Sequence, residues 1–304
     1  MPGNNALAVN SVVGQHANLE ITTHGSDWYF AVCAIMGFST LAFMGMAFTK
    51  PQSHRLFNYL TAAITATACI SYFCMGSNLG QVPIQAEFVR PGRAQVAGAD
   101  LLRALHRLVH YDPLLLTDLL LTSGVSWPTL IAVLFADIAM VVTGLVGALT
   151  QTRYKWGFWT FGMFGLFYII YELIGPARRN AAALGEGPKK TFLMCGVLLS
   201  FLWFLYPIAW GLSEGGNVIH PDSEAIFYGI LDVIAKPVWG ALLLWGHRNI
   251  TPQQLGLHIR GDTSPISEKG RGPHGAHGGA PDGPATTAGA NGTPATAGAG
   301  GATV

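Results

Sequence analysis

The chain contains few charged residues. Asp, Glu, Lys and Arg together make up 11% of its 304 residues, whereas soluble proteins contain about 25% of these residues. Hydrophobic residues account for 50% of the chain, and several apolar runs reach the roughly 20 residues that a helix needs to cross a bilayer. The composition therefore argues against an ordinary soluble domain and favours an integral membrane protein.

Other common features are also missing. The net charge of +1 provides no basic surface for a polyanion, so we expect no nucleic-acid partner. The four cysteines lack the spacing of a metal site or a disulfide framework, and we interpret them as small buried hydrophobic residues. The sequence also has no recognisable nucleophile and base pair, metal-ligand spacing or phosphate-binding loop, so we expect a protein that is not an enzyme.

Seven apolar runs predict an all-α bundle of seven transmembrane helices over residues 27–248. The runs cover residues 27–49, 57–77, 113–122, 127–150, 156–175, 191–213 and 224–246. Residues 1–26 lack the features of a cleavable signal peptide and are expected to form an extracellular tail without fixed structure. Residues 249–304 are rich in Gly, Ala and Pro, which predicts a disordered cytoplasmic tail. The loop at 78–100 leaves room for a small hairpin.

The basic residues of the loops predict the orientation of the chain. One side carries Lys50, Arg55, Arg178, Arg179, Lys189, Lys190 and Arg248, and the other carries Arg90, Arg93, Arg153 and Lys155. Because cytoplasmic loops carry more Lys and Arg, the larger group predicts a cytoplasmic C-terminus and an extracellular N-terminus. We expect a multi-pass protein of the plasma membrane.

Two ionisable residues lie in the middle of the last run, "YGILDVIAKPVWGALLLW". A charge at this depth costs at least about 2.5 kcal/mol, so each is a candidate functional group. Asp232 and Lys236 are four residues apart and share a helix face, where a structural ion pair is one interpretation. Pro237 supports another, because it removes a backbone hydrogen bond beside the lysine, and a desolvated amine is suited to forming a Schiff base with an aldehyde.

The segment "LDVIAKPVWG" resembles the retinal-attachment segment of the microbial rhodopsins, the family that includes bacteriorhodopsin and the fungal opsins. In the preceding run, "FLWFLYPIAW", the residues Trp203, Tyr206 and Trp210 share one helix face. Such a stripe is often ordinary core packing, but it is similar to the aromatic walls that enclose retinal in this family. The resemblance implies that all-trans retinal is bound covalently to Lys236 as a protonated Schiff base, with Asp232 as a counterion.

Further matches imply the remaining roles. "LFADIAMVVTGLVGAL" places Asp137 and Met140 beside the ring of the retinal, and "PLLLTDLLL" places Asp118 where outward proton pumps of the family keep a proton donor. Glu214 and Glu224 are similar to the extracellular proton-release pair of the family. Each of these roles has an alternative. Glu214 and Glu224 can be read instead as solvated loop carboxylates. The carboxyl of Asp137 can instead form a hydrogen bond to a neighbouring helix.

One segment departs from the family pattern. Members carry R-Y-x-D-W-x-x-T-T-P at this point, and its arginine and aspartate act as a gate and as the main counterion. When the two are aligned on Pro113, the corresponding positions hold Ala104 and Arg107. If this segment is genuine, a cation faces the retinal nitrogen, and we expect an opsin that does not pump.

A shift of reading frame explains the departure. With synonymous codons chosen for residues 99–113, the same bases read one position later encode Q-I-F-Y-A-R-Y-I-D-W-F-I-T-T, which restores the family motif. We therefore hypothesise that residues from about 99 to 112 are translated out of frame. The restored chain would carry Ala104→Arg, Arg107→Asp and Leu108→Trp.

The resemblance implies a light-driven outward proton pump, in which Asp118 supplies a proton from the cytoplasmic side and the two glutamates release one outside. An alternative is a photosensor with a slow photocycle that signals to a partner protein, with the C-terminal tail as a docking segment. A retinal-free membrane chaperone related to opsins is a third interpretation, which the retention of Lys236 disfavours. The expected partners are retinal, the lipid bilayer and protons, and a homo-oligomer is left open.

Overall fold

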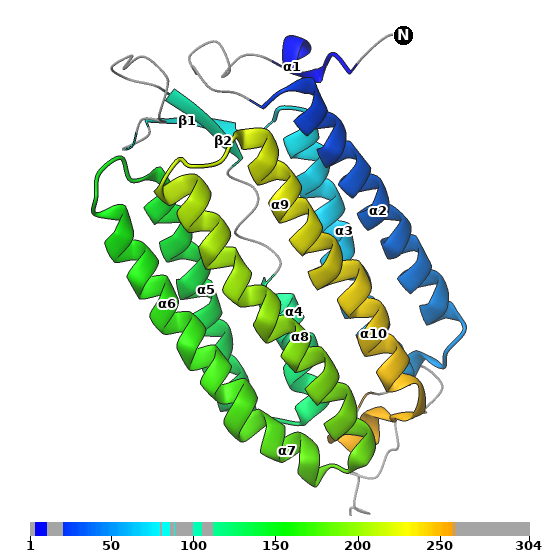
Figure 1. The fold of residues 1–304 in the computed structure, drawn as a ribbon. Helices are drawn as coiled ribbons and strands as arrows, with labels where there is room; N and C mark the ends of the chain where they lie inside the picture. Colours follow the sequence, from blue (N-terminus) through cyan, green and yellow to red (C-terminus); the bar gives the residue numbers. More distant parts are fainter. Residues whose placement is uncertain are drawn as a thin grey trace, which may run out of the picture. The chain divides into compact units, whose positions relative to one another are not determined.

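The computed structural model describes residues 4–10, 21–79, 81–85, 88, 100–104, 112–257 and 259. Within these residues the chain forms seven helical rods that lie side by side (Figure 1). Six rods are long and apolar enough to cross a membrane, and the third is a shorter apolar helix. The predicted seven-helix architecture is confirmed, and the protein is an integral membrane protein.

The rods follow one another along the chain. They are α2 (Thr23–Phe48), α3 (Leu56–Gly76), α4 (Asp112–Ser123), α5 (Trp127–Leu149), α6 (Lys155–Glu172) with α7 (Arg178–Ala183), α8 (Glu186–Trp210), and α9 (Pro221–Val233) with α10 (Trp239–Gly246). Three rods contain a π-helical turn: η4 (Leu173–Ala177), η5 (Gly211–Gly215) and η6 (Ile234–Val238). The helix α2 packs along both α3 and α9, and α5 packs along α6.

Polar side chains face the inside of the bundle, and many large apolar side chains face outward. Phe38, Leu41 and Phe135 are 75%, 74% and 73% exposed, whereas Asp118 and Asp137 are 0% exposed. An apolar exterior suits lipid, and ionisable groups are tolerated only where neighbouring helices can satisfy them. The fold therefore gathers these ionisable residues of the spans along its interior.

The described part of the N-terminal segment is folded. The helix α1 (Ala6–Val9) precedes the bundle, and Asn10 Nδ2 donates a hydrogen bond to the carbonyl of Ser77 at 2.8 Å. The expectation of an unstructured tail is therefore wrong for residues 4–10, because Asn10 ties α1 to the end of α3. The first rod also begins at Thr23 rather than at residue 27.

At the other end, ordered structure continues past the predicted boundary at residue 248. The short helix η8 (Pro252–Leu255) follows the last rod, and Leu255 is 3% exposed in the main hydrophobic core. The packed domain therefore extends to residue 257. Residues 260–304 lie outside the described residues, so the disordered tail stays a prediction.

A small hairpin precedes the third rod. The strands β1 (Gln81–Gln85) and β2 (Asp100–Ala104) pair in antiparallel fashion, so the loop does hold a hairpin, but β2 occupies the start of the segment assigned to a frame shift. Residues 105–111 lie outside the described residues, and that hypothesis stays a prediction. The described part of the third rod, α4, has 12 residues, or about 18 Å, against about 30 Å for a bilayer core.

Candidate functional site

A buried ion pair lies where α9 continues through η6 into α10. Lys236 Nζ donates a hydrogen bond to Asp232 Oδ1 at 2.5 Å, and each residue is 3% exposed. Pro237 has no N–H and interrupts the α-helical hydrogen bonding, and the chain forms a π-helical turn here. The structure thus brings together the amine and the carboxylate that the four-residue spacing predicted.

Two tyrosines complete the surroundings of Asp232. Tyr72 OH on α3 donates to Asp232 Oδ2 at 2.8 Å, and Tyr206 OH on α8 donates to Asp232 Oδ1 at 2.5 Å. Hydrogen bonds to an ionised group are about twice as strong as neutral ones, so three donors hold a negative charge beside the Lys236 nitrogen. Sequence reasoning included Tyr206 but missed Tyr72, because its partner lies 160 residues away and nothing in its own apolar run distinguishes it.

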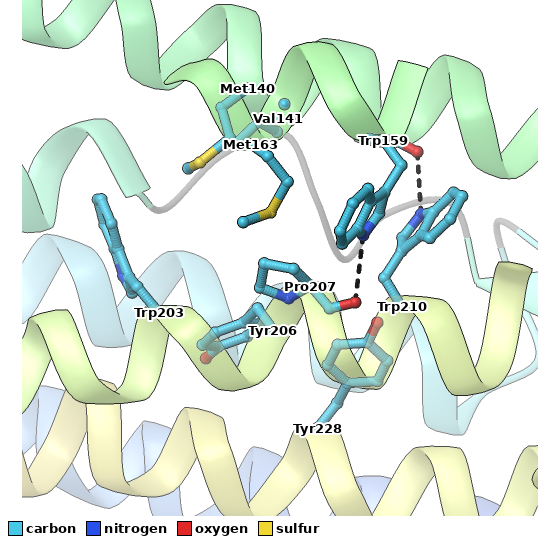
Figure 2. A pocket seen from close by; sticks show the side chains of 11 residues that line it. Met140, Val141, Trp159, Met163, Trp203, Tyr206, Pro207, Trp210 and Tyr228 are labelled. Atoms are coloured by element: carbon cyan, nitrogen blue, oxygen red, sulfur yellow. Dashed lines mark hydrogen bonds between the residues drawn. The ribbon is translucent and has the colours of Figure 1, made fainter. Parts of the chain in front are cut away.

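An apolar cavity of about 100 Å³ lies next to this network (Figure 2). Its walls come from α5, α6, α8 and α9, and consist of Met140, Val141, Gly144, Trp159, Gly162, Met163, Trp203, Tyr206, Pro207, Trp210 and Tyr228. Tyr206 lines the cavity and also donates to Asp232, so it connects the cavity to the ion pair. Four of the predicted retinal contacts, Met140, Trp203, Tyr206 and Trp210, therefore meet at one place.

Indole hydrogen bonds fix two walls of the cavity. Trp159 Nε1 donates to Pro207 O at 3.3 Å, and Trp210 Nε1 donates to Gly144 O at 3.1 Å (Figure 2). These bonds join α6 and α5 to α8, so the tryptophan planes are held by the backbone of the facing helices. Sequence reasoning missed Trp159, because aromatic residues recur throughout α6 without a pattern that selects one.

Asp137 is not among the described residues that line the cavity. It is 0% exposed on α5, about one turn before Met140. Asp137 therefore lies next to the cavity wall along α5 without forming part of it, and its role stays a prediction.

The two glutamates lie toward the end of the bundle where α9 begins. Glu214 lies in η5 and accepts hydrogen bonds from Ser213 Oγ and, at 3.3 Å, from Tyr228 OH. Glu224 is 5% exposed in the first turn of α9, one turn before Tyr228. Its burial argues against a solvated loop carboxylate. Tyr228 also lines the cavity, so it connects the cavity to Glu214.

Asp118 lies on the short helix α4, which occupies the half of the bundle away from the hairpin (Figure 1). It is 0% exposed, and its Oδ2 accepts a hydrogen bond from Thr61 Oγ1 at 3.0 Å. Thr61 and Tyr72 are eleven residues apart on α3, a rise of about 16 Å. Asp118 is therefore separated from the Asp232 and Lys236 pair by about this distance along the bundle.

Comparison with known proteins matches most of the chain. A family model described as "Bacteriorhodopsin-like protein" matches residues 24–250, a range that contains every site residue described above. The opsin-like protein carO of Fusarium fujikuroi is 53% identical over 268 residues, which cover 84% of this chain and 85% of that protein.

Solved structures are also similar to most of the chain. The light-driven proton pump LR (Mac) from Leptosphaeria maculans has a TM-score of 0.72 at 31% identity, covering 76% of this chain and 100% of that one. The light-driven proton pump Coccomyxa subellipsoidea rhodopsin has a TM-score of 0.70 at 32% identity, covering 75% of this chain and 98% of that one.

Proposed function

The chain belongs to the bacteriorhodopsin-like family, whose members are light-driven pumps or sensors with a retinal chromophore, and we propose that it is a light-driven outward proton pump. The observation that carries the proposal is the buried pair of Lys236 and Asp232 beside a cavity with tryptophan walls. The similarity to two solved proton pumps supports transport over signalling.

The residues of the site fit all-trans retinal. Lys236 provides a buried amine, and Trp203, Tyr206 and Trp210 provide flat walls for a conjugated chain, with Met140 toward its ring. When bound, retinal supplies a covalent linkage to Lys236 and a light-driven isomerisation that changes the proton affinity of the linked nitrogen.

Asp232 provides a negative charge beside this nitrogen, and Asp118 stores a proton on its cytoplasmic side. Asp232, with its three donors, stays negative and stabilises a proton on Lys236 Nζ. Asp118 is fully buried, and an ionised carboxylate without a cationic partner is costly there, so its carboxyl stores a proton. We assign it the resupply of the Lys236 nitrogen from the cytoplasmic side.

In the proposed pump, Glu214 and Glu224 release a proton at the opposite end of the bundle from Asp118. Tyr228 links Glu214 to the cavity wall, and Glu224 is buried one turn away from Tyr228. A proton shared within this cluster passes to the solvent at the end of the bundle where α9 begins. In the proposed orientation that end is extracellular, the C-terminus is cytoplasmic, and the chain resides in the plasma membrane.

A second candidate function follows from the residue at position 107. The acceptor of the nitrogen's proton is, in our proposal, the aspartate that the restored reading frame places there. The chain as printed carries Arg107 at that position. If residues 99–112 are genuine, we infer a retinal-binding opsin without net proton transport.

The test compares the printed chain with the restored-frame chain. Each is supplied with all-trans retinal, reduced with borohydride and mapped by peptide mass spectrometry, and we expect an adduct at Lys236. Lys236→Arg should lose the adduct, while Lys190→Arg, at an exposed position, should keep it. Absence of the adduct in both chains would overturn the retinal assignment.

Transport is measured on the same proteins in vesicles. The restored-frame chain should move protons outward on illumination, and a protonophore should abolish the signal. An adduct at Lys236 with a slow photocycle and without proton transport would favour the sensory photoreceptor. Sequencing the transcript decides the frame, and an uninterrupted set of codons for "RALHRLVHYD" refutes the shift.

A further inference from the structure

A buried histidine lies at the end of the last rod, outside the groups used above. His247 begins η7 (His247–Asn249) and is 6% exposed. Its ring stacks on Phe57 with 4.0 Å between ring centroids. Nδ1 lies 2.9 Å from the carbonyl oxygen of Leu243, and Nε2 lies 3.1 Å from Thr122 Oγ1 on α4. Both ring nitrogens have partners, and the stacking restrains the plane of the ring.

These hydrogen bonds determine which nitrogen can exchange a proton. A carbonyl oxygen only accepts, so Nδ1 carries a hydrogen, and the neutral ring presents Nε2 as an acceptor. Thr122 Oγ1 has one hydrogen and two acceptors within reach, His247 Nε2 at 3.1 Å and Asp118 O at 3.0 Å. The hydroxyl donates to an unprotonated Nε2, whereas it accepts from a protonated Nε2 and donates to Asp118 O. Rotation of one hydroxyl therefore accommodates both charge states of the ring.

His247 also lines a cavity at this end of the bundle. The cavity has a volume of about 220 Å³, and its other lining residues include Lys50, His54 and Arg248. This volume holds several waters, since one water occupies about 30 Å³ in the liquid. Lys50 Nζ donates to Asn58 Oδ1 at 2.8 Å, and burial lowers the pKa of Lys50. The positive charges of Lys50 and Arg248 repel an imidazolium, so a proton that reaches His247 is passed on rather than retained.

The carboxyl group of Asp118 lies on the inner side of the same histidine. Thr122 follows Asp118 by one helical turn, so the hydroxyl and the carboxyl share a face of α4. Asp118 Oδ2 accepts from Thr61, while Oδ1 has no hydrogen-bond partner among the residues that the structure describes. A chain of polar groups thus leads from the cavity through His247 and Thr122 toward the carboxyl group of Asp118.

We propose that His247 is the proton-uptake relay between this cavity and Asp118. The proposal rests on the pump function above, in which Asp118 gives its proton to the Lys236 nitrogen and becomes a carboxylate. When the Thr122 hydroxyl turns to Asp118 O, His247 Nε2 is free to take a proton from cavity water. The imidazolium then donates its Nε2 hydrogen to Thr122 Oγ1 in the same step in which the hydroxyl passes its own hydrogen through one water to Asp118 Oδ1. Each cycle transfers one proton and leaves His247 and Thr122 unchanged.

The first test measures proton exchange in the dark, without retinal, on the full chain. Infrared spectroscopy in D2O follows the band of the protonated Asp118 carboxyl, which Asp118→Asn identifies by removing it. His247→Gln retains a hydrogen-bonding group but cannot carry the proton, and we expect exchange at least about tenfold slower. Thr122→Val, with nearly the same shape, should slow exchange similarly. His24→Gln, the same change at an exposed residue of α2, should leave the rate unchanged.

The second test follows proton uptake after a flash in the restored-frame chain with retinal. In His247→Gln, uptake should slow by a similar factor, depend on the concentration of hydronium, and recover when imidazole is added. If the parent chain takes up no proton, the pump is refuted, and the dark exchange still decides the relay. Unchanged dark exchange in His247→Gln overturns the relay while leaving the pump intact.

An unaltered chain provides a measurement that does not depend on the variants folding. The exchange rate of the Asp118 carboxyl should follow the protonation of His247, measured by nitrogen-15 NMR over the same pH series. A rate that varies independently of the His247 signal overturns the relay.

Discussion

Replacing Asp232 with asparagine is expected to destabilise the apoprotein strongly, because it leaves the Lys236 amine buried without a counter-charge. The two groups are 2.5 Å apart and each residue is 3% exposed, so solvent cannot replace the carboxylate. Breaking one side of a buried ion pair costs about 3–5 kcal/mol. We therefore expect the free energy of unfolding to fall by about 3–5 kcal/mol.

Thermal unfolding in detergent, followed by circular dichroism without retinal, measures this loss of stability. Combining Asp232→Asn with Lys236→Met removes both charges and should recover most of the stability, because neutral replacement of a buried pair is often tolerated. Lys190→Met, at an exposed position, is the matched control for loss of a lysine. If Asp232→Asn stays within about 0.5 kcal/mol of the parent at pH 7, the carboxylate does not stabilise a cation at Lys236.

Three smaller perturbations test other contacts. Thr61→Val removes the hydroxyl that donates at 3.0 Å to the buried carboxyl of Asp118. The free energy of unfolding in denaturant titrations should fall by about 1–2 kcal/mol, and an unchanged value contradicts this contact. Burial lowers the pKa of Lys50 below 10.5, so the folded state loses this proton first and stability rises as pH increases through the folded pKa. A pH series should show that Lys50→Met lacks this rise. A Cβ at Gly229 would lie 2.3 Å from Trp28 Nε1, whereas one at Gly157 meets nothing within 4 Å. Gly229→Ala should therefore cost about 1–3 kcal/mol in thermal unfolding, and equal effects at both glycines would refute the packing argument.

The ion pair was predictable from the sequence and its tyrosine partners were only partly so. Asp232 and Lys236 lie on one helix, and the helical repeat alone places them on one face. Tyr206 was found through its spacing from Trp203 on the same helix. Tyr72 belongs to a different rod, 160 residues from its acceptor, and no local period relates them. Contacts within a helix follow from spacing, whereas contacts between rods depend on how the rods pack.

The same distinction applies to His247 and to the π-helical turns. Pro237 indicated a local opening of the last helix, and η6 lies there. The π register itself depends on neighbouring helices that satisfy the displaced backbone groups. His247 gave no sequence signal, because its partner Thr122 lies 125 residues away.

The described helices predict where residue 107 would lie if α4 were longer at its N-terminal end. Thr61 contacts Asp118, and Tyr72, eleven residues further along α3, contacts Asp232. Extending α4 back from Asp118 by eleven helical residues gives a rise of about 16 Å and a net rotation of only about 20°. Because α3 and α4 run in opposite directions, residue 107 would then lie level with Tyr72, and so with the ion pair.

An arginine at that level would add a second cation beside Lys236, with Asp232 as the carboxylate that faces both. An aspartate would instead give the amine a second negative partner. A continuous helix from residue 104 to Ser123 would also hold 20 residues, or about 30 Å, which matches the bilayer core. In our proposal, a single change of reading frame at residues 99–112 would therefore place an aspartate level with the ion pair and give the third rod the length of the bilayer core.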